Sequence, residues 1–125
     1  MKPGIKKYTE KAEFYTEEKC FVNELSNTSD DEDVSIAKIR VLPGVTTNWH
    51  RLKDTTERYV ILAGSGIVEI SDLPGQAVCQ GDVVVIPPMF RQRITNIGKT
   101  DLIFLAVCTP RFTADLYEDL EERNF

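Results

Sequence analysis

Cysteine is scarce in this chain, and the three that are present form no recognisable pair. Cys20, Cys79 and Cys108 lie far apart, their number is odd, and no C-x-x-C motif occurs. This pattern argues against a disulfide framework and against a zinc knuckle. Unpaired cysteines are typical of a reducing compartment, so we expect a cytoplasmic protein.

Long apolar segments are also missing. The two longest, residues 83–88 and 102–108, are much too short to cross a bilayer, which takes about 20 residues. The first 15 residues lack the apolar core of a signal peptide. The sequence therefore predicts no membrane association, and the two segments have the length and composition of buried strands.

Positive charge is not in excess either. The 125 residues include 15 Lys and Arg against 20 Asp and Glu, a net charge of −5, and the basic residues are scattered. Binding to nucleic acid is driven by clustered basic side chains, so we expect no nucleic-acid partner. The length fits one domain with a core of its own.

Short β-type segments, separated by turn residues, make up most of the chain. Nine are predicted, at residues 20–25, 34–41, 45–51, 57–63, 67–70, 77–80, 83–86, 91–96 and 102–108. Their spacing is typical of an all-β sandwich or barrel. The turn at residues 64–66 (Gly-Ser-Gly) predicts a hairpin between its two neighbours.

Three regions follow from this pattern. Residues 1–18 are charged and aperiodic, and we expect an N-terminal arm that packs on the barrel or on a second subunit. Residues 19–112 form the barrel. Residues 113–125 are expected to form a short helical tail, in which Thr113 is the N-cap and Leu116 and Leu120 share one face.

Two stretches carry a further signal. In the first, Gly44 is followed after five residues by His50, then by Leu52, Glu57 and Gly64 at intervals of one, four and six residues. This resembles the first motif of the cupin family, glycine, His-x-His, glutamate and glycine, with Leu52 in place of the second histidine.

The second stretch runs from Gly81 through Pro87, Met89 and Gln92 to Asn96. It resembles the second cupin motif, in which a glycine stands at the position of Met89 and a histidine at that of Gln92. The two matches together span residues 44–96. The resemblance implies a cupin-type double-stranded β-helix, a jelly-roll-like barrel, and a site inside it.

The resemblance also implies a divalent metal, held in the family by three histidines and a glutamate. Here the set is reduced to His50, Glu57 and Gln92, because His50 is the only histidine of the chain. Imidazole and carboxylate suit zinc, nickel, iron or manganese, whereas an amide oxygen is a weaker ligand. The alternative is a hydrogen-bonded cluster of these three side chains in a metal-free pocket.

Strand alternation predicts which side chains share the pocket, because every second residue faces the same side. The predicted ligand pocket consists of Asn48, His50, Glu57, Tyr59, Phe90, Gln92 and Ile94. Among them Glu57 and Tyr59 are the candidate catalytic residues. Cys108 ends the last apolar strand, and it either reaches the pocket rim or is a buried structural thiol.

Three functions remain open from the sequence. The first is a small-molecule-binding barrel of unknown substrate that acts as a metal-dependent enzyme. The second is a metal-free acid–base enzyme, similar to a sugar isomerase or epimerase. The third is a non-catalytic sensor of a small-molecule ligand. The resemblance to small cupins further implies a homodimer.

Overall fold

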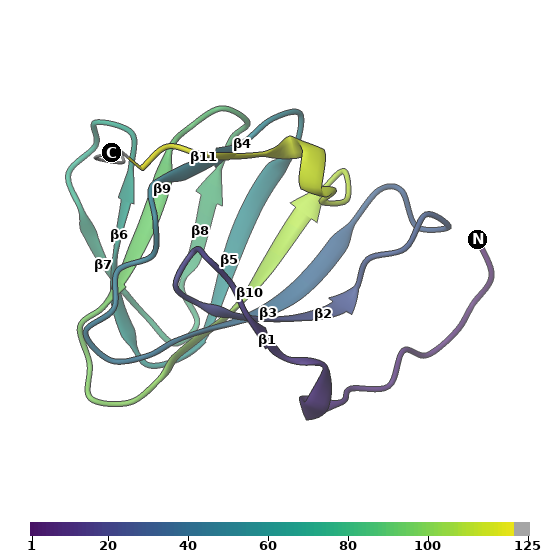
Figure 1. Ribbon diagram of the computed structural model, residues 1–125, viewed down its shortest axis with the longest axis horizontal. Coiled ribbons are helices and arrows are strands. Elements are labelled where there is room, and N and C mark those ends of the chain that lie inside the picture. Colours follow the sequence, from purple (N-terminus) through teal and green to yellow (C-terminus); the bar gives the residue numbers. More distant parts are fainter. Residues whose placement is uncertain (122–125) are drawn as a thin grey trace.

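The computed structural model describes residues 1–121, and almost all of its regular structure is β (Figure 1). Two 3₁₀ turns accompany the strands, η1 (Glu10–Ala12) and η2 (Ala114–Leu116). The strands are β1 (Phe14–Tyr15), β2 (Phe21–Ser26), β3 (Ser35–Val41), β4 (His50–Leu52), β5 (Thr56–Ala63), β6 (Ser65–Ile70), β7 (Gln76–Cys79), β8 (Val83–Ile86), β9 (Gln92–Asn96), β10 (Leu102–Thr109) and β11 (Tyr117–Asp119). The prediction of an all-β chain is confirmed.

These strands form two antiparallel sheets. One has the order β1-β2-β3-β10-β5-β8 and the other the order β11-β4-β9-β6-β7. Burial alternates strictly along β9 and β10, so that one face of each strand points inward and the other outward. The residues between the sheets include Val41, Ile94 and Leu102, which are almost completely buried.

The chain changes sheets at Gly64, and the predicted hairpin at residues 64–66 is wrong. β5 pairs with β10 and β8, whereas β6 pairs with β7 and β9. Gly64 has a φ of +88°, and a Cβ there would lie 2.7 Å from the carbonyl oxygen of Asp101. The glycine therefore allows a sharp corner at which the chain passes from one sheet to the other. A turn motif in the sequence does not reveal whether its two neighbouring strands pair with each other or enter different sheets.

The expected C-terminal helix is also wrong over most of its length. Only the three residues of η2 are helical, and β11 follows at once and pairs with β4. Thr113 precedes η2 but makes no capping hydrogen bond with its side chain. Pairing with an open sheet edge outweighs the i, i+4 spacing of two leucines. Residues 122–125 of the predicted tail lie outside the described residues.

The N-terminal arm packs against its own barrel. β1 pairs with β2, and the side chain of Asn23 donates to the carbonyl oxygen of Thr9. Arg40 on β3 holds Glu13 at 2.6 Å. These contacts fix the segment that leads into Cys20 and hold β1 beside β2 at the edge of the six-stranded sheet (Figure 1).

The outer faces of the two sheets differ in chemistry. The outward side chains of the six-stranded sheet around β5, β8 and β10 are largely apolar; they include Val83 and Val85, which are 59% and 56% exposed. On the other sheet, the guanidinium groups of Arg91 and Arg93 lie 4.2 and 4.3 Å from the ring centre of Trp49. No helix among residues 1–121 is long and apolar enough to cross a membrane.

Candidate functional site

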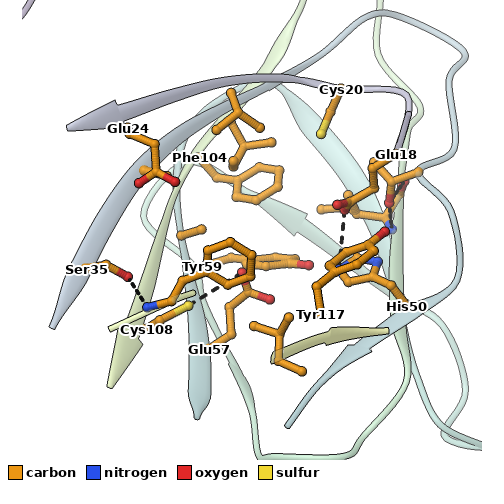
Figure 2. A pocket seen from close by; sticks show the side chains of 18 residues that line it. Glu18, Cys20, Glu24, Ser35, His50, Glu57, Tyr59, Phe104, Cys108 and Tyr117 are labelled. Atoms are coloured by element: carbon orange, nitrogen blue, oxygen red, sulfur yellow. Dashed lines mark hydrogen bonds and ion pairs between the residues drawn. The ribbon is translucent and has the colours of Figure 1, made fainter. Parts of the chain in front are cut away.

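A pocket opens between the sheets, with about 670 Å³ of empty space that includes its mouth (Figure 2). Its walls come from the arm and from β2, β3, β4, β5, β9, β10 and β11. Most of the lining is apolar or aromatic, with a few polar groups, which is the usual composition of a small-molecule site. The polar groups determine what chemistry the pocket supports.

His50, on β4, has both ring nitrogens engaged. Nδ1 lies 2.7 Å from the carbonyl oxygen of Asn48. Because a carbonyl oxygen only accepts, Nδ1 carries a hydrogen and Nε2 is the basic nitrogen of the neutral ring. Nε2 lies 3.3 Å from Oε1 of Glu18. A bond between these two atoms requires one proton, held by either the carboxyl group or the imidazole.

Glu18 comes from the end of the arm, and its side chain is only 23% exposed. Burial raises its pKa to about 7, the negative charge of Asp119 adds to the rise, and a hydrogen bond with Tyr117 opposes it. The Tyr117 ring stacks on that of His50 with centroids 5.3 Å apart. Glu18, His50 and Tyr117 thus form one connected group at one side of the pocket (Figure 2).

Glu57, on β5, is the second carboxyl group with an altered acidity. Burial raises its pKa to about 7, and the nearby imidazole of His50 partly opposes this. Its Oε1 atom is buried without a hydrogen-bond partner among the described residues, and Oε2 lies 4.0 Å from the Cys108 sulfur. A carboxylate without strong donors is poorly stabilised, so Glu57 exchanges its proton near neutral pH.

Tyr59, which lines the pocket, forms a buried pair with Gln92. The Tyr59 hydroxyl donates to Oε1 of Gln92, and the Tyr59 ring lies 4.4 Å from that of Phe104. Burial, together with the charge of Glu57, raises the pKa of Tyr59 well above its ordinary value, so its hydroxyl stays protonated. Gln92 sits opposite His50 across β4 and β9 but does not line the pocket.

The other predicted pocket residues divide three ways. Ile94 lines the pocket. Asn48 is buried but does not line it; its side chain donates to the carbonyl oxygen of Glu17 and holds the arm in place. Phe90 is 43% exposed and lies outside the pocket, which corrects the prediction. The alternation of β9 begins only at Gln92, so extending it back to Phe90 carried it into a turn.

Several polar lining residues were not predicted. Glu18 and Tyr117 come from the two segments outside the predicted barrel, and nothing in their spacing marks them. Glu24 and Ser35 line the other side of the pocket. Cys108 does line it, and burial raises the pKa of its thiol to about 12, which leaves the thiol protonated.

The predicted metal set of His50, Glu57 and Gln92 does not fit a metal in this arrangement. The basic nitrogen of His50 faces Glu18, and the amide oxygen of Gln92 accepts the hydroxyl of Tyr59. Among residues 1–121, no three His, Cys, Asp or Glu side chains are grouped so as to hold one ion. His50 and the amide oxygen of Gln92 thus have protein partners, as in the hydrogen-bonded alternative, whereas Glu57 Oε1 has none among the described residues.

Comparison with known proteins gives one match among curated sequences. A glucose-6-phosphate isomerase from Pyrococcus abyssi is 34% identical over 82 residues, which cover 62% of this chain. The chain spans 43% of the length of that relative, less than half. No family model matches the sequence.

Solved structures give a broader likeness. An uncharacterised protein with a double-stranded β-helix domain from Klebsiella pneumoniae is 14% identical with a TM-score of 0.74, covering 90% of this chain and 94% of its own. The chain has the double-stranded β-helix fold. Two further solved structures of this cupin-type fold are named for an activity. A nucleoside dehydratase from Streptomyces is 13% identical with a TM-score of 0.76 over 92% of this chain and 90% of its own. A predicted oxalate decarboxylase from Thermotoga maritima is 26% identical, with a TM-score of 0.67 over 73% and 80%.

Proposed function

We propose that this double-stranded β-helix protein is an acid–base enzyme that moves protons on a small polar molecule and needs no metal for this step. The observation that carries the proposal is the arrangement of His50 with Glu18 on one side of the pocket and Glu57 as a second titrating carboxyl group. Both carboxyl groups have pKa values of about 7, where a general acid or base is most effective.

The proton inventory of the site allows a complete cycle. The substrate has a carbon that bears a hydroxyl group next to a carbonyl carbon. The pair of His50 and ionised Glu18 takes a proton from the first carbon, and protonated Glu57 gives its proton to the carbonyl oxygen. Glu57 then recovers a proton from the hydroxyl group of the first carbon, and the pair returns a proton to the former carbonyl carbon. The net result is an isomerisation with no net gain or loss of protons, and the abstracted proton can exchange with solvent before a proton is returned to carbon. The hydrogen bond between Tyr59 and Gln92 supports the pocket wall and takes no part in these proton transfers.

The names of the similar proteins support this choice among the open alternatives. The curated relative is by name an isomerase of a sugar phosphate. The Streptomyces dehydratase has been solved with uridine as variants of one histidine and of two tyrosines. The pocket of the present protein also contains one histidine and two tyrosines, His50, Tyr59 and Tyr117.

Solvent-isotope exchange tests the proposal without knowledge of the product. Unmodified sugars and nucleosides are incubated with the protein in D₂O, and NMR follows the replacement of carbon-bound hydrogen by deuterium. Exchange is expected with the native chain, with or without a chelator, and is expected to be lost in His50→Gln. The control is Glu10→Gln, an exposed carboxyl group on η1 away from the pocket. Exchange that disappears with the chelator and returns with one divalent metal would refute the metal-free step.

We further propose that the protein is a homodimer. The apolar outer face around β5, β8 and β10 supports this, because Leu62, Val83 and Val85 would be partly shielded from water by a second copy. Light scattering is expected to give twice 14.2 kDa for the native chain and a mass near 14.2 kDa for Val85→Glu. A native mass of one chain would reject the dimer.

The three cysteines support the further proposal of a cytoplasmic location. All three are free thiols, and two of them, Cys20 and Cys108, are buried. Thiol labelling after denaturation of protein taken directly from cells is expected to modify all three. A chain isolated with a disulfide would contradict this location.

A further inference from the structure

We infer that the pocket selects uncharged, hydroxyl-bearing ring molecules and rejects their phosphorylated counterparts. The inference names the substrate class of the proposed acid–base site and rests on that site. Every charged side chain that lines the pocket is a carboxyl group, namely Glu18, Glu24 and Glu57. Within the described chain, no Lys or Arg is part of the lining.

Arg58 and Arg111 act electrostatically on lining residues but do not line the pocket themselves. Arg111 donates to the amide oxygen of Asn27 at 2.8 Å and lies 3.6 Å from Glu32. Arg58 donates to the Thr109 hydroxyl at 2.6 Å. Phosphate recognition normally relies on Arg or Lys, or on a helix N-terminus, and the described lining offers neither.

A phosphate group would therefore enter a pocket of its own sign of charge. It carries between one and two negative charges near neutral pH, and a site of low effective dielectric constant strengthens their repulsion from ionised carboxylates. Like charges placed together oppose binding strongly. The curated relative is named for a sugar phosphate. The pocket lining of the present chain is unsuited to the phosphate group of such a substrate.

Hydroxyl groups and rings match what the pocket does offer. Tyr59, Phe104, Phe112 and Tyr117 supply flat apolar surfaces for a ring. The Ser35 hydroxyl, which accepts the backbone N–H of Phe112, adds a polar group to the lining. The carboxyl groups accept when ionised and donate when protonated. A hydroxyl group, which donates and accepts, suits both states, whereas an ammonium group only donates.

Matched pairs of probes test the inference. Binding of uridine against uridine 5′-monophosphate, and of glucose against glucose 6-phosphate, is measured by NMR titration at pH 7.5. For at least one pair we expect the uncharged member to bind about tenfold more tightly or better. Equal or tighter binding of the phosphorylated member would overturn the inference. So would a failure of both uncharged probes to bind, and the isotope-exchange assay would still test the acid–base proposal separately.

A charge change at the pocket rim gives a second, independent test. Glu24 on β2 is exposed at the mouth and takes no part in the proposed proton transfer. Glu24→Lys is expected to improve binding of the phosphorylated probe by about tenfold and to change binding of the uncharged probe by less than about twofold, with Glu24→Gln in between. No gain in Glu24→Lys, with the fold retained, would show that charge does not control selection.

Discussion

Asn96 and Glu57 both occupy fixed positions of the two motifs, yet their surroundings are opposite. The Asn96 side chain donates to the carbonyl oxygens of Val41 and Thr100 and accepts the N–H of Gly98, all at 2.9 Å. Glu57 Oε1 is buried without a hydrogen-bond partner among residues 1–121, and burial raises the pKa of its carboxyl group to about 7. The hydrogen-bonded Asn96 side chain holds the fold, whereas the carboxyl group of Glu57 keeps an oxygen available for a reaction.

The largest effect that separates the two ends is expected from Glu57→Gln. The amide is nearly isosteric but cannot exchange a proton, so isotope exchange should fall by about 10²–10⁴-fold. Thermal unfolding should show no loss of stability at pH 7.5, because the buried negative charge has been removed. A variant that keeps its exchange rate would remove Glu57 from the mechanism.

Asn96→Ala should have the opposite effect to Glu57→Gln, because its main loss is expected in stability and not in isotope exchange. It leaves two carbonyl oxygens and one N–H without their partner, and we expect it to lower the free energy of unfolding by about 2–5 kcal/mol. Chemical denaturation measures the loss. Thr46→Ala, which removes one hydroxyl from a pair on the partly buried surface, serves as a milder control. Equal losses in both variants would contradict the central role of Asn96.

The pH dependence of stability gives the next effect. Glu18 and Glu57 have folded-state pKa values of about 7 against 4.5 without the fold, so the folded chain binds more protons between these values. Stability from these groups is therefore full below about pH 4.5 and is lost as pH rises through about 7, by roughly 1–3 kcal/mol for each. Unfolding measured from pH 5 to 8 should show this fall.

Glu57→Gln should remove its part of that fall, and Glu10→Gln should leave the fall intact. An unchanged slope in Glu57→Gln would show that its carboxyl group is ionised normally in the folded chain. The comparison needs no substrate.

The smallest effect is expected from Tyr59→Phe. It removes the hydroxyl that occupies the amide oxygen of Gln92, and it should cost about 1–2 kcal/mol of stability. Isotope exchange should fall by less than about tenfold, because Tyr59 supports the pocket through Gln92. A loss as large as that of Glu57→Gln would make Tyr59 a catalytic residue.

The sequence was informative where a local pattern of residues is enough to define a strand or a shared site. Alternation located β3 closely, and β-rich runs bounded by turn residues located β5 and β10. The motif spacing placed His50 and Glu57 at one pocket. The sequence was uninformative about which sheet edge a segment joins, since β11 looked like a helix and Gly64 like a hairpin turn.

The charged partner of His50 could not be found from spacing. Glu18 lies 32 positions before the histidine, in an arm with several other glutamates, and tertiary contacts of the arm bring it there. The N–H of Asn48 donates to the carbonyl oxygen of Glu18 at 3.2 Å, so position and not residue pattern selects this carboxyl group.

Trp49 has a practical consequence. It is the single tryptophan of the chain, it precedes His50, and it lies between two guanidinium groups. Its backbone carbonyl oxygen accepts the N–H of Leu120, and its own N–H donates to the carboxylate of Glu121. Two hydrogen bonds therefore join Trp49 to the tail that carries Tyr117. The emission of this one indole should therefore change if the tail separates from β4, which makes it an intrinsic fluorescent reporter of that contact.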